Sequence, residues 1–432
     1  MSGISMTYPE TLQWLYTQLP MYQRVGAAAM KKDLTNIRRL CAALGEPHRA
    51  VPVIHIAGTN GKGSTAHMLS AVLQAAGYQV GLYTSPHYRD FRERIKRNGR
   101  LVPEEWVVTF VEKHRDVFTD IQPSFFEITV AMAFQYFAQA EVDIAVIETG
   151  LGGRLDSTNI VTPELSIITN ISYDHMQFLG DTLAQIAGEK AGIIKPGVPV
   201  VIGETQSESR PVFLAKAEQQ AAPISFADQH VTATLQDADF RHSVFRVMRG
   251  GEVWFERLAV DVYGEYQRLN LQTVLHSLQQ LADGWGITEQ HIADGLGDLR
   301  RRTRFLGRWQ QLGASPLILS DSAHNEAGLQ QVVAQLRRIP HRRLHLVFGM
   351  VNDKDTDKVL SFLPQEAIYY FARPDVPRGL DAAELQQRAA AVGRMGGVYP
   401  SVGEALAAAK TAATADDLIF VGGSIFVVAE VV

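Results

Sequence analysis

The chain has 432 residues, which exceeds the size of one ordinary domain and predicts two or three domains. Hydrophobic residues make up 46% and charged residues 20%, a composition typical of a globular protein and not of a disordered or fibrous one. The net charge is −5 and there is no long basic run, which argues against nucleic acid as a partner. Local Lys and Arg side chains can still meet anionic substrates.

A single cysteine, Cys41, excludes an intrachain disulfide and a cysteine zinc cluster. It lies in an apolar helical pattern, so we expect a core residue. The N-terminus lacks the basic-then-apolar pattern of a signal peptide, and no apolar run approaches the ~20 residues of a membrane span. We expect a soluble cytoplasmic protein that makes no contact with membranes, and we expect it to act as a monomer.

Two amphipathic helices are predicted at the start of the chain, over 9–19 and 31–44. A polar-aromatic loop over 21–26 separates them, and its role is open. The apolar face of the first helix is made by Leu12, Leu15, Tyr16 and Leu19.

Residues 53–65 predict a nucleotide phosphate site. An apolar strand over 53–57 leads into a glycine-rich turn around Lys62, and a helix opened by Ser64 follows. Glycines let backbone N–H groups approach phosphates, the helix N-terminus favours negative charge, and the lysine supplies a mobile cation. A hydroxyl at the helix start can ligate Mg²⁺, which makes Ser64 a candidate.

The spacing of this turn departs from the common P-loop, in which four residues separate Gly from Gly-Lys-Ser/Thr. Here two residues separate Gly58 from Gly61, and Gly63 lies between Lys62 and Ser64. A glycine turn alone is more often structural than functional. The lysine between two glycines, after a strand and before a helix, favours phosphate binding.

Further along the chain, strands alternate with helices, which predicts a parallel sheet covered on both faces. A helix is expected to begin at Pro103, and residues 224–262 are expected to contain a hairpin around Gly250-Gly251. The remaining expected elements of this part are strands over 79–84, 142–148, 165–171 and 198–202 and helices over 125–139 and about 266–285.

A second α/β segment begins near residue 315 and has no phosphate loop of its own. The basic run over 300–304 before it is interpreted as a solvated helix end, in preference to a phosphate clamp. We therefore predict a P-loop domain over 1–304, a linker over 305–314 and a C-terminal Rossmann-like α/β domain over 315–432. Its expected strands cover 317–320, 344–348, 367–371 and 418–421.

Polar residues at strand ends are the first candidates for chemistry, because ligands of open parallel sheets lie beyond the carboxyl ends of the strands. Glu148 follows four apolar residues and precedes a glycine-rich stretch, which favours a Mg²⁺ ligand over an acid that caps an exposed strand end. His175 beside Asp174 is equally compatible with a ligand and with an ordinary histidine.

Two other polar residues have simple local explanations. Lys190 on its own is expected to be a solvated helix lysine, and Asp321 can be explained as the cap of the next helix. There is no Gly-x-Ser-x-Gly nucleophile elbow, so a covalent hydrolase has no support.

Several stretches resemble motifs of the folylpolyglutamate synthase/dihydrofolate synthase family, within the Mur-type ATP-dependent amide ligases, and they follow in that family's order. The stretch that begins at Glu148 is the most specific. They are residues 57–65, 84–87, 124–127, 148–159, 174–175, 188–194 and 321–325.

The resemblance implies an ATP site, a magnesium site and a modified lysine. Lys62 would hold the ATP phosphates, Ser85, Glu148 and His175 match magnesium ligands, and Lys190 matches a lysine that relatives carry carbamylated. It therefore gives the Mg²⁺ role to Ser85, whereas the loop pattern gives it to Ser64. The implied ATP-binding residues are Gly58, Thr59, Asn60, Gly61, Lys62, Gly63, Ser64, Asn270, Arg308 and Asp321.

By the same resemblance, Phe126, Glu127, Leu155 and Asp156 lie where the family binds its pterin substrate. The linker departs from the family pattern, since it has Leu306-Gly-Arg308 where Pro-Gly-Arg is usual.

The family's chemistry is amide formation. A substrate carboxylate attacks the γ-phosphate of ATP, and the amine of L-glutamate then displaces phosphate from the acyl phosphate. We therefore expect an ATP- and Mg²⁺-dependent ligase that acts on dihydropteroate, on folates or on both. A Mur-type ligase for a cell-wall nucleotide peptide and a P-loop switch ATPase are the alternatives, and the strand-end cluster over 148–175 disfavours the second.

Overall fold

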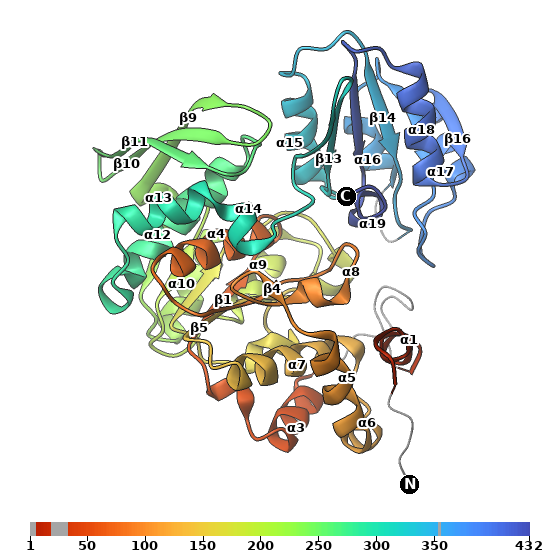
Figure 1. Cartoon of the computed structure of the whole chain (residues 1–432). Helices are drawn as coiled ribbons and strands as arrows, with labels where there is room; N and C mark the ends of the chain where they lie inside the picture. Colours follow the sequence, from red (N-terminus) through yellow and green to blue (C-terminus); the bar gives the residue numbers. More distant parts are fainter. Residues whose placement is uncertain (1–5, 19–32, 353–355) are drawn as a thin grey trace. The chain divides into compact units, whose positions relative to one another are not determined.

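A computed structural model describes residues 6–18, 33–352 and 356–432 (Figure 1). Its contacts divide the chain into two units. The first comprises Met1–Thr234, Arg246–Leu258 and Leu269–Arg304, and the second Leu235–Phe245, Ala259–Arg268 and Phe305–Val432. Leu19, the loop over 21–26 and the first two residues of the helix expected over 31–44 lie outside the described residues.

The first unit is built on an eight-stranded sheet in which β1 (Val53–Ala57) lies between β5 (Ile144–Glu148) and β6 (Leu165–Ile168) and runs parallel to both. Every residue of β1 and β5 is buried, which explains why both sequences are apolar except for His55 and the terminal Glu148. The strand order is β4-β3-β2-β5-β1-β6-β7-β8. The other strands are β2 (Val80–Tyr83), β3 (Ile95–Arg97), β4 (Arg100–Leu101), β7 (Val200–Ile202) and β8 (Ile224–Phe226).

Helices cover this sheet in separate hydrophobic clusters. One cluster joins β1 and β5 to α1 (Tyr8–Gln18), α3 (Thr35–Ala43), α5 (Glu104–Lys113), α6 (Arg115–Ile121) and α7 (Phe125–Gln139). Cys41 and Leu15 are fully buried in it, as predicted. Another joins the ends of β1, β6 and β7 to α8 (Met176–Leu179), α9 (Leu183–Ala191) and α10 (Arg210–Gln219).

The helix after the glycine turn, α4 (Lys62–Ala75), is buried from Ser64 to Leu73. It packs against α13 (Glu289–Gly297) and α14 (Leu299–Thr303), which follow α12 (Gln267–Trp285). Gly295 permits this close approach, because a Cβ there would lie 2.5 Å from Val72 Cα and 2.7 Å from Val72 N. Arg301 is largely exposed at the end of α14, as expected of a solvated basic helix end.

We expect Gly295→Ala to destabilise the protein by about 1–3 kcal/mol, because two backbones would have to move apart to admit one methyl group. Urea or thermal unfolding measures the change. Gly284→Ala in α12 is the matched control, since nothing lies within 4 Å of a Cβ there. It should stabilise the helix by about 0.5–1 kcal/mol. Equal effects of the two substitutions would contradict the packing argument.

The predicted hairpin is confirmed. β10 (Ser243–Arg249) and β11 (Glu252–Val260) are joined by Gly250-Gly251, and β9 (Val231–Ala238) completes a three-stranded sheet. Both glycines have positive φ, +59° and +89°, as the two central residues of a type I′ turn require.

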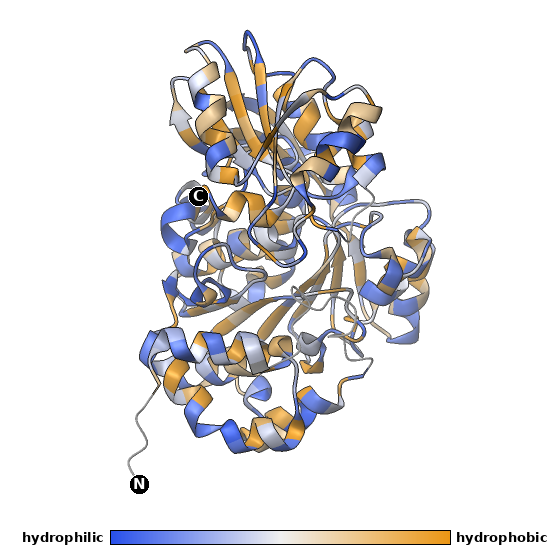
Figure 2. Cartoon of the chain, turned by 90° about the vertical axis from the view of Figure 1, so that its right-hand side faces the viewer, coloured by the Kyte–Doolittle hydropathy of each residue, from blue (hydrophilic) through white to orange (hydrophobic). Residues whose placement is uncertain are grey.

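The second unit contains a six-stranded sheet in the order β12-β13-β17-β14-β15-β16, in which only β12 is antiparallel to its neighbour. The strands are β12 (Gln310–Ala314), β13 (Leu317–Asp321), β14 (Leu344–Phe348), β15 (Ile368–Ala372), β16 (Gly396–Tyr399) and β17 (Leu418–Gly422). One face packs against α15 (Glu326–Leu336), α16 (Thr356–Phe362) and α17 (Ala382–Ala391), and the other against α18 (Val402–Ala412) and α19 (Ile425–Ala429). Figure 2 shows these strands as mainly hydrophobic.

The sequence missed both edge strands of this sheet. β16 begins with two glycines and is half-exposed, and β12 is polar at its start and lies within the range expected as a linker. Edge strands need no continuous apolar run, so the pattern that identified the central strands is absent from them.

None of the helices in the described part of the chain is long and apolar enough to cross a membrane.

Candidate active site

The glycine turn between β1 and α4 is shaped by close contacts that exclude side chains. Gly58 has φ +147°, and a Cβ there would lie 1.8 Å from the Thr169 hydroxyl oxygen. Gly61 has φ +84°, and a Cβ there would lie 2.1 Å from Asn270 Oδ1. Both positions therefore require glycine. The second contact brings Asn270 of α12 to the turn.

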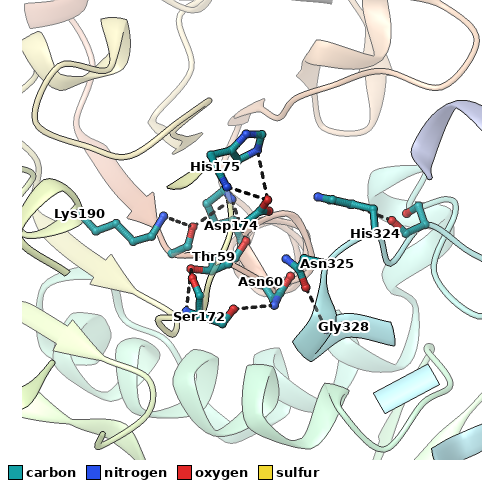
Figure 3. Close-up of polar contacts among 12 residues, drawn as sticks. Thr59, Asn60, Ser172, Asp174, His175, Lys190, His324, Asn325 and Gly328 are labelled. Carbon is teal, nitrogen blue, oxygen red and sulfur yellow. Dashed lines mark hydrogen bonds and ion pairs between the residues drawn. The ribbon is translucent and has the colours of Figure 1, made fainter. Parts of the chain in front are cut away.

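Hydrogen bonds fix the turn to the segment after β6 (Figure 3). The N–H groups of Thr59 and Asn60 donate to Asn170, to its carbonyl at 2.9 Å and to its Oδ1 at 3.0 Å. Ser172 N–H donates to Thr59 Oγ1 at 3.0 Å, and Asn60 Nδ2 donates to Ser172 Oγ at 3.2 Å. Sequence reasoning missed Asn170 and Ser172, and their place just after a buried strand was the only available signal.

Two lysines converge on one carbonyl of the turn. Lys62 Nζ donates to the Gly58 carbonyl at 3.1 Å and to the Thr59 carbonyl at 3.2 Å. Lys190 Nζ, from α9, donates to the same Gly58 carbonyl at 2.9 Å (Figure 3). Lys190 is 3% exposed, so the interpretation of it as a solvated helix lysine is wrong. Burial, with the nearby Lys62 charge, lowers the pKa of Lys190 to about 7.

Glu148 ends β5 and is 5% exposed, so it does not cap an exposed strand end. Its Oε2 accepts the N–H of Ser85 at 3.1 Å. A Cβ on Gly63 would lie 3.6 Å and 3.8 Å from the two carboxylate oxygens. Glu148 and Ser85 therefore lie together at the N-terminal turn of α4.

His175 begins the short helix α8 with φ +48°. Its N–H donates to Asp174 Oδ1 at 2.9 Å, and its Nε2 lies 3.8 Å from the same oxygen (Figure 3). Asp174 also acts on Lys190, where its negative charge opposes the lowering of the pKa. The loop after β6 thus carries both the bonds that fix the glycine turn and the Asp174–His175 pair.

The donors near the start of α4 fit a hard divalent cation. A carboxylate and a hydroxyl supply oxygens, and phosphate oxygens and water commonly complete such a site. Among residues 6–18, 33–352 and 356–432, no group of three or more His, Cys, Asp and Glu side chains is placed to hold a metal by itself. In the expected set of Ser85, Glu148 and His175, only Glu148 and His175 are of these residue types. A metal ion bound there would depend on the substrate for further ligands.

The residues expected to bind the pterin have structural contacts of their own. Glu127 is 2% exposed and caps α7, since its Oε2 accepts the Ser124 N–H at 2.7 Å. Leu155 is half-buried. The Phe126 ring fills the space beside Gly150, where a Cβ would lie 2.4 Å from ring Cζ.

Asp156 orders the loop that follows β5. Its Oδ2 accepts the N–H groups of Gly150 and Leu151, both at 2.8 Å, and its Oδ1 accepts the Thr158 N–H at 3.0 Å. The Thr158 hydroxyl donates to Oδ1 at 2.5 Å and lies 2.8 Å from Nε2 of the buried His55 in β1. Burial raises the pKa of Asp156, and these hydrogen bonds oppose that shift.

In the second unit, Asp321 ends β13 and is 2% exposed. Its carboxylate accepts the Trp309 N–H at 3.0 Å, the Tyr266 hydroxyl at 2.8 Å and the Ala323 N–H at 2.8 Å. It therefore fixes the residue after Arg308. The interpretation of Asp321 as a helix cap is wrong, because Asn325 caps α15 through the Gly328 N–H at 2.9 Å (Figure 3).

Two family models match the chain. The Mur ligase middle domain matches residues 56–277, and the Mur ligase glutamate ligase domain matches residues 307–425. The chain is 36% identical to dihydrofolate synthase/folylpolyglutamate synthase of Bacillus subtilis, over 88% of each chain. It spans about half the length of two other relatives, both named probable bifunctional folylpolyglutamate synthase/dihydropteroate synthase.

Solved structures agree with these matches. Escherichia coli FolC in complex with DHPP and ADP superposes with a TM-score of 0.87 at 30% identity, over 99% of this chain and 97% of that one. Bifunctional folylpolyglutamate synthase/dihydrofolate synthase of Yersinia pestis, complexed with AMPPNP and a Mn ion, gives 0.85 at 27% identity, over 99% and 97%. The chain therefore belongs to the Mur ligase family of ATP-dependent ligases, within its folylpolyglutamate synthase/dihydrofolate synthase group.

Proposed function

We propose that this chain uses ATP and Mg²⁺ to join L-glutamate to dihydropteroate and to reduced folates, through an acyl-phosphate intermediate. The observation that carries the proposal is the convergence of Lys62 and Lys190 on the Gly58 carbonyl, at the start of α4 and in the same unit as Glu148 and Ser85. Positive charge, backbone N–H groups and a buried carboxylate are the parts that phosphoryl transfer to a carboxylate requires.

Each of these groups has a defined chemical task. Lys62 and the N-terminal N–H groups of α4 neutralise the phosphate oxygens as negative charge builds up on them. The substrate carboxylate attacks the γ-phosphorus and ADP leaves. The glutamate amine then attacks the acyl carbon, and phosphate leaves as the amide forms. A divalent cation held by Glu148, Ser85 and His175 would supply further charge neutralisation.

Lys190 is suited to carbamylation. A pKa of about 7 leaves much of its amine uncharged at neutral pH, and only the uncharged amine attacks CO₂. The uncharged amine forms an N–C bond with CO₂ and releases one proton, so the carbamate carries a negative charge where the protonated lysine would carry a positive one. That change removes the repulsion between two cations that share one carbonyl and adds an oxygen ligand near the metal residues.

The assignment of single residues to ATP or to the pterin substrate rests on the family resemblance and on the environment of each residue. ATP contacts by Asn270, Arg308 and Asp321 are proposed, as are pterin contacts by Phe126, Leu155 and Asp156. For Glu127, the capping hydrogen bond supports a positioning role.

The proposal is tested by measuring phosphate release from ATP in the presence of Mg²⁺. Dihydropteroate, tetrahydrofolate or neither is offered, each with and without L-glutamate, and the pterin product is identified by mass. We expect release only when a pterin substrate and glutamate are both present, with a product heavier by one glutamyl residue. Phosphate release that depends on neither the pterin substrate nor L-glutamate would exclude the proposed ligase.

A further inference from the structure

Arg94 is a buried cation that has no carboxylate partner in the described part of the chain. It ends the short helix η3 (Phe91–Arg94) and is 3% exposed. Arg92, two residues earlier, pairs with Asp90 at 2.6 Å and with Glu104 at 3.1 Å. Arg94 has no such pair among the described residues, and its Nε donates a hydrogen bond to the neutral acceptor His87 Nδ1 at 2.8 Å. A buried charge is costly unless it is paired, so the absence of an acid calls for an explanation.

The acids near Arg94 are already engaged. Asp90 accepts bonds from Arg92 Nε and Nη2 and from the Tyr8 hydroxyl. Glu93 accepts the backbone N–H groups of Tyr88, Arg89 and Asp90. The undescribed segments of the first unit, residues 1–5 and 19–32, contain no Asp or Glu. The protein's own first unit therefore offers no carboxylate for this guanidinium.

The guanidinium is held in place by uncharged groups. Its Cζ lies 5.5 Å from the centre of the Phe125 ring, and His87 fixes Nε. The Tyr83 hydroxyl also forms a side-chain hydrogen bond with Arg94, so both hydrogen-bond partners identified for the guanidinium, His87 and Tyr83, are uncharged. The remaining N–H groups of the guanidinium can form the bonds by which arginine binds a carboxylate.

The neighbours of Arg94 connect it to the proposed substrate region. His87 follows two residues after Ser85, whose N–H is bonded to Glu148. Phe125 precedes Phe126, whose ring centre lies 6.4 Å from that of Tyr83. The Tyr83 hydroxyl is buried, and both the charge and a side-chain hydrogen bond of Arg94 act on it. An aromatic substrate with a carboxylate would match this combination of rings, hydroxyl and cation.

We propose that Arg94 binds a carboxylate of the pterin-bearing substrate, with His87 as the residue that positions the guanidinium. This inference rests on the proposed function. The carboxylate has two possible sources. It is either the reacting carboxylate, which dihydropteroate and tetrahydrofolate both carry, or the α-carboxylate of the terminal glutamate, which only tetrahydrofolate carries.

The test is the steady-state kinetics of Arg94→Met with each substrate. Loss of a charge-assisted hydrogen-bond pair should raise KM about 10- to 100-fold, while the KM for ATP stays unchanged. A rise for tetrahydrofolate alone identifies the α-carboxylate, and a rise for both substrates identifies the reacting carboxylate. Arg94→Lys should recover part of the loss, because it restores the charge without the planar fork.

Arg92→Met is the matched control, since it removes a cation from the same short helix that already has acidic partners. It should leave both KM values within about twofold of wild type. Thermal unfolding checks that the variants fold, and Arg94→Gln replaces Arg94→Met if the latter does not. A folded variant without the Arg94 charge that keeps wild-type KM for both substrates would overturn the inference. Failure of the wild-type enzyme to use either pterin would instead overturn the proposed function.

Discussion

Replacing Lys62 with alanine is expected to lower kcat about 10³-fold, because the cation at the phosphate turn is lost where charge develops during phosphoryl transfer. The fold should survive, since within residues 6–18, 33–352 and 356–432 Lys62 Nζ bonds only to the carbonyls of Gly58 and Thr59, and both glycine contacts of the turn involve other residues. Phosphate release with a pterin substrate and glutamate measures the effect, and thermal unfolding confirms the folded state.

Two further variants sharpen this result. Lys62→Arg keeps the positive charge but changes the shape of the group that carries it. We therefore expect its kcat to lie between those of the wild type and Lys62→Ala. Lys113→Ala removes an exposed lysine from the end of α5 and should leave kcat unchanged. Folded Lys62→Ala with wild-type turnover would remove the phosphate role from the turn.

Lys190→Met is expected to lower kcat about 10²-fold, in line with the loss of a group that orients a metal site. Added bicarbonate should not restore activity, because the amine that would react with CO₂ is gone. Lys195→Met is the matched control. Its Nζ donates to the Asn159 carbonyl at 2.9 Å, and burial lowers its pKa to about 8, but it shares no carbonyl with Lys62. Full activity in Lys190→Met, or an equal loss in Lys195→Met, would reject the role of Lys190.

Stability against pH gives a second measurement on Lys190. Its pKa is about 7 in the folded protein, against an ordinary value near 10.4 when unfolded. Between these values the unfolded chain binds the extra proton, so this group makes stability rise with pH, by at most about 1.4 kcal/mol per unit. In CO₂-free buffer, denaturant unfolding from pH 7 to 10 should show a shallower rise for Lys190→Met than for wild type. Parallel curves would mean that Lys190 is not buried as an amine.

The outline of the fold followed from local patterns. The buried strands at 53–57, 144–148 and 344–348 are mainly apolar, and the Gly250-Gly251 hairpin depends on two adjacent residues with positive φ, which glycine adopts without strain. Such features are decided within a few residues, so periodicity and turn chemistry suffice to predict them. The edge strands β12, which is polar at its start, and β16, which begins with two glycines, carry no such pattern and were missed.

The chemical environment of the site residues was decided by chain segments far apart in sequence. Lys190 has the local sequence of a solvated helix lysine, and only its contact with Gly58, 132 residues away, makes it a buried amine with a lowered pKa. Asp321 suits a helix cap by type, yet its carboxylate binds Trp309 and Tyr266. The unpaired charge of Arg94 likewise depends on which neighbours engage the nearby acids.

The sequence by itself thus determined where a glycine turn with a lysine must form, because Gly58, Gly61 and Lys62 specify a local backbone path and a cation. The tertiary structure decided which distant groups meet that turn. Desolvation and charge pairing depend on all the atoms within a few ångströms, and these come from β5, α9 and the loop after β6.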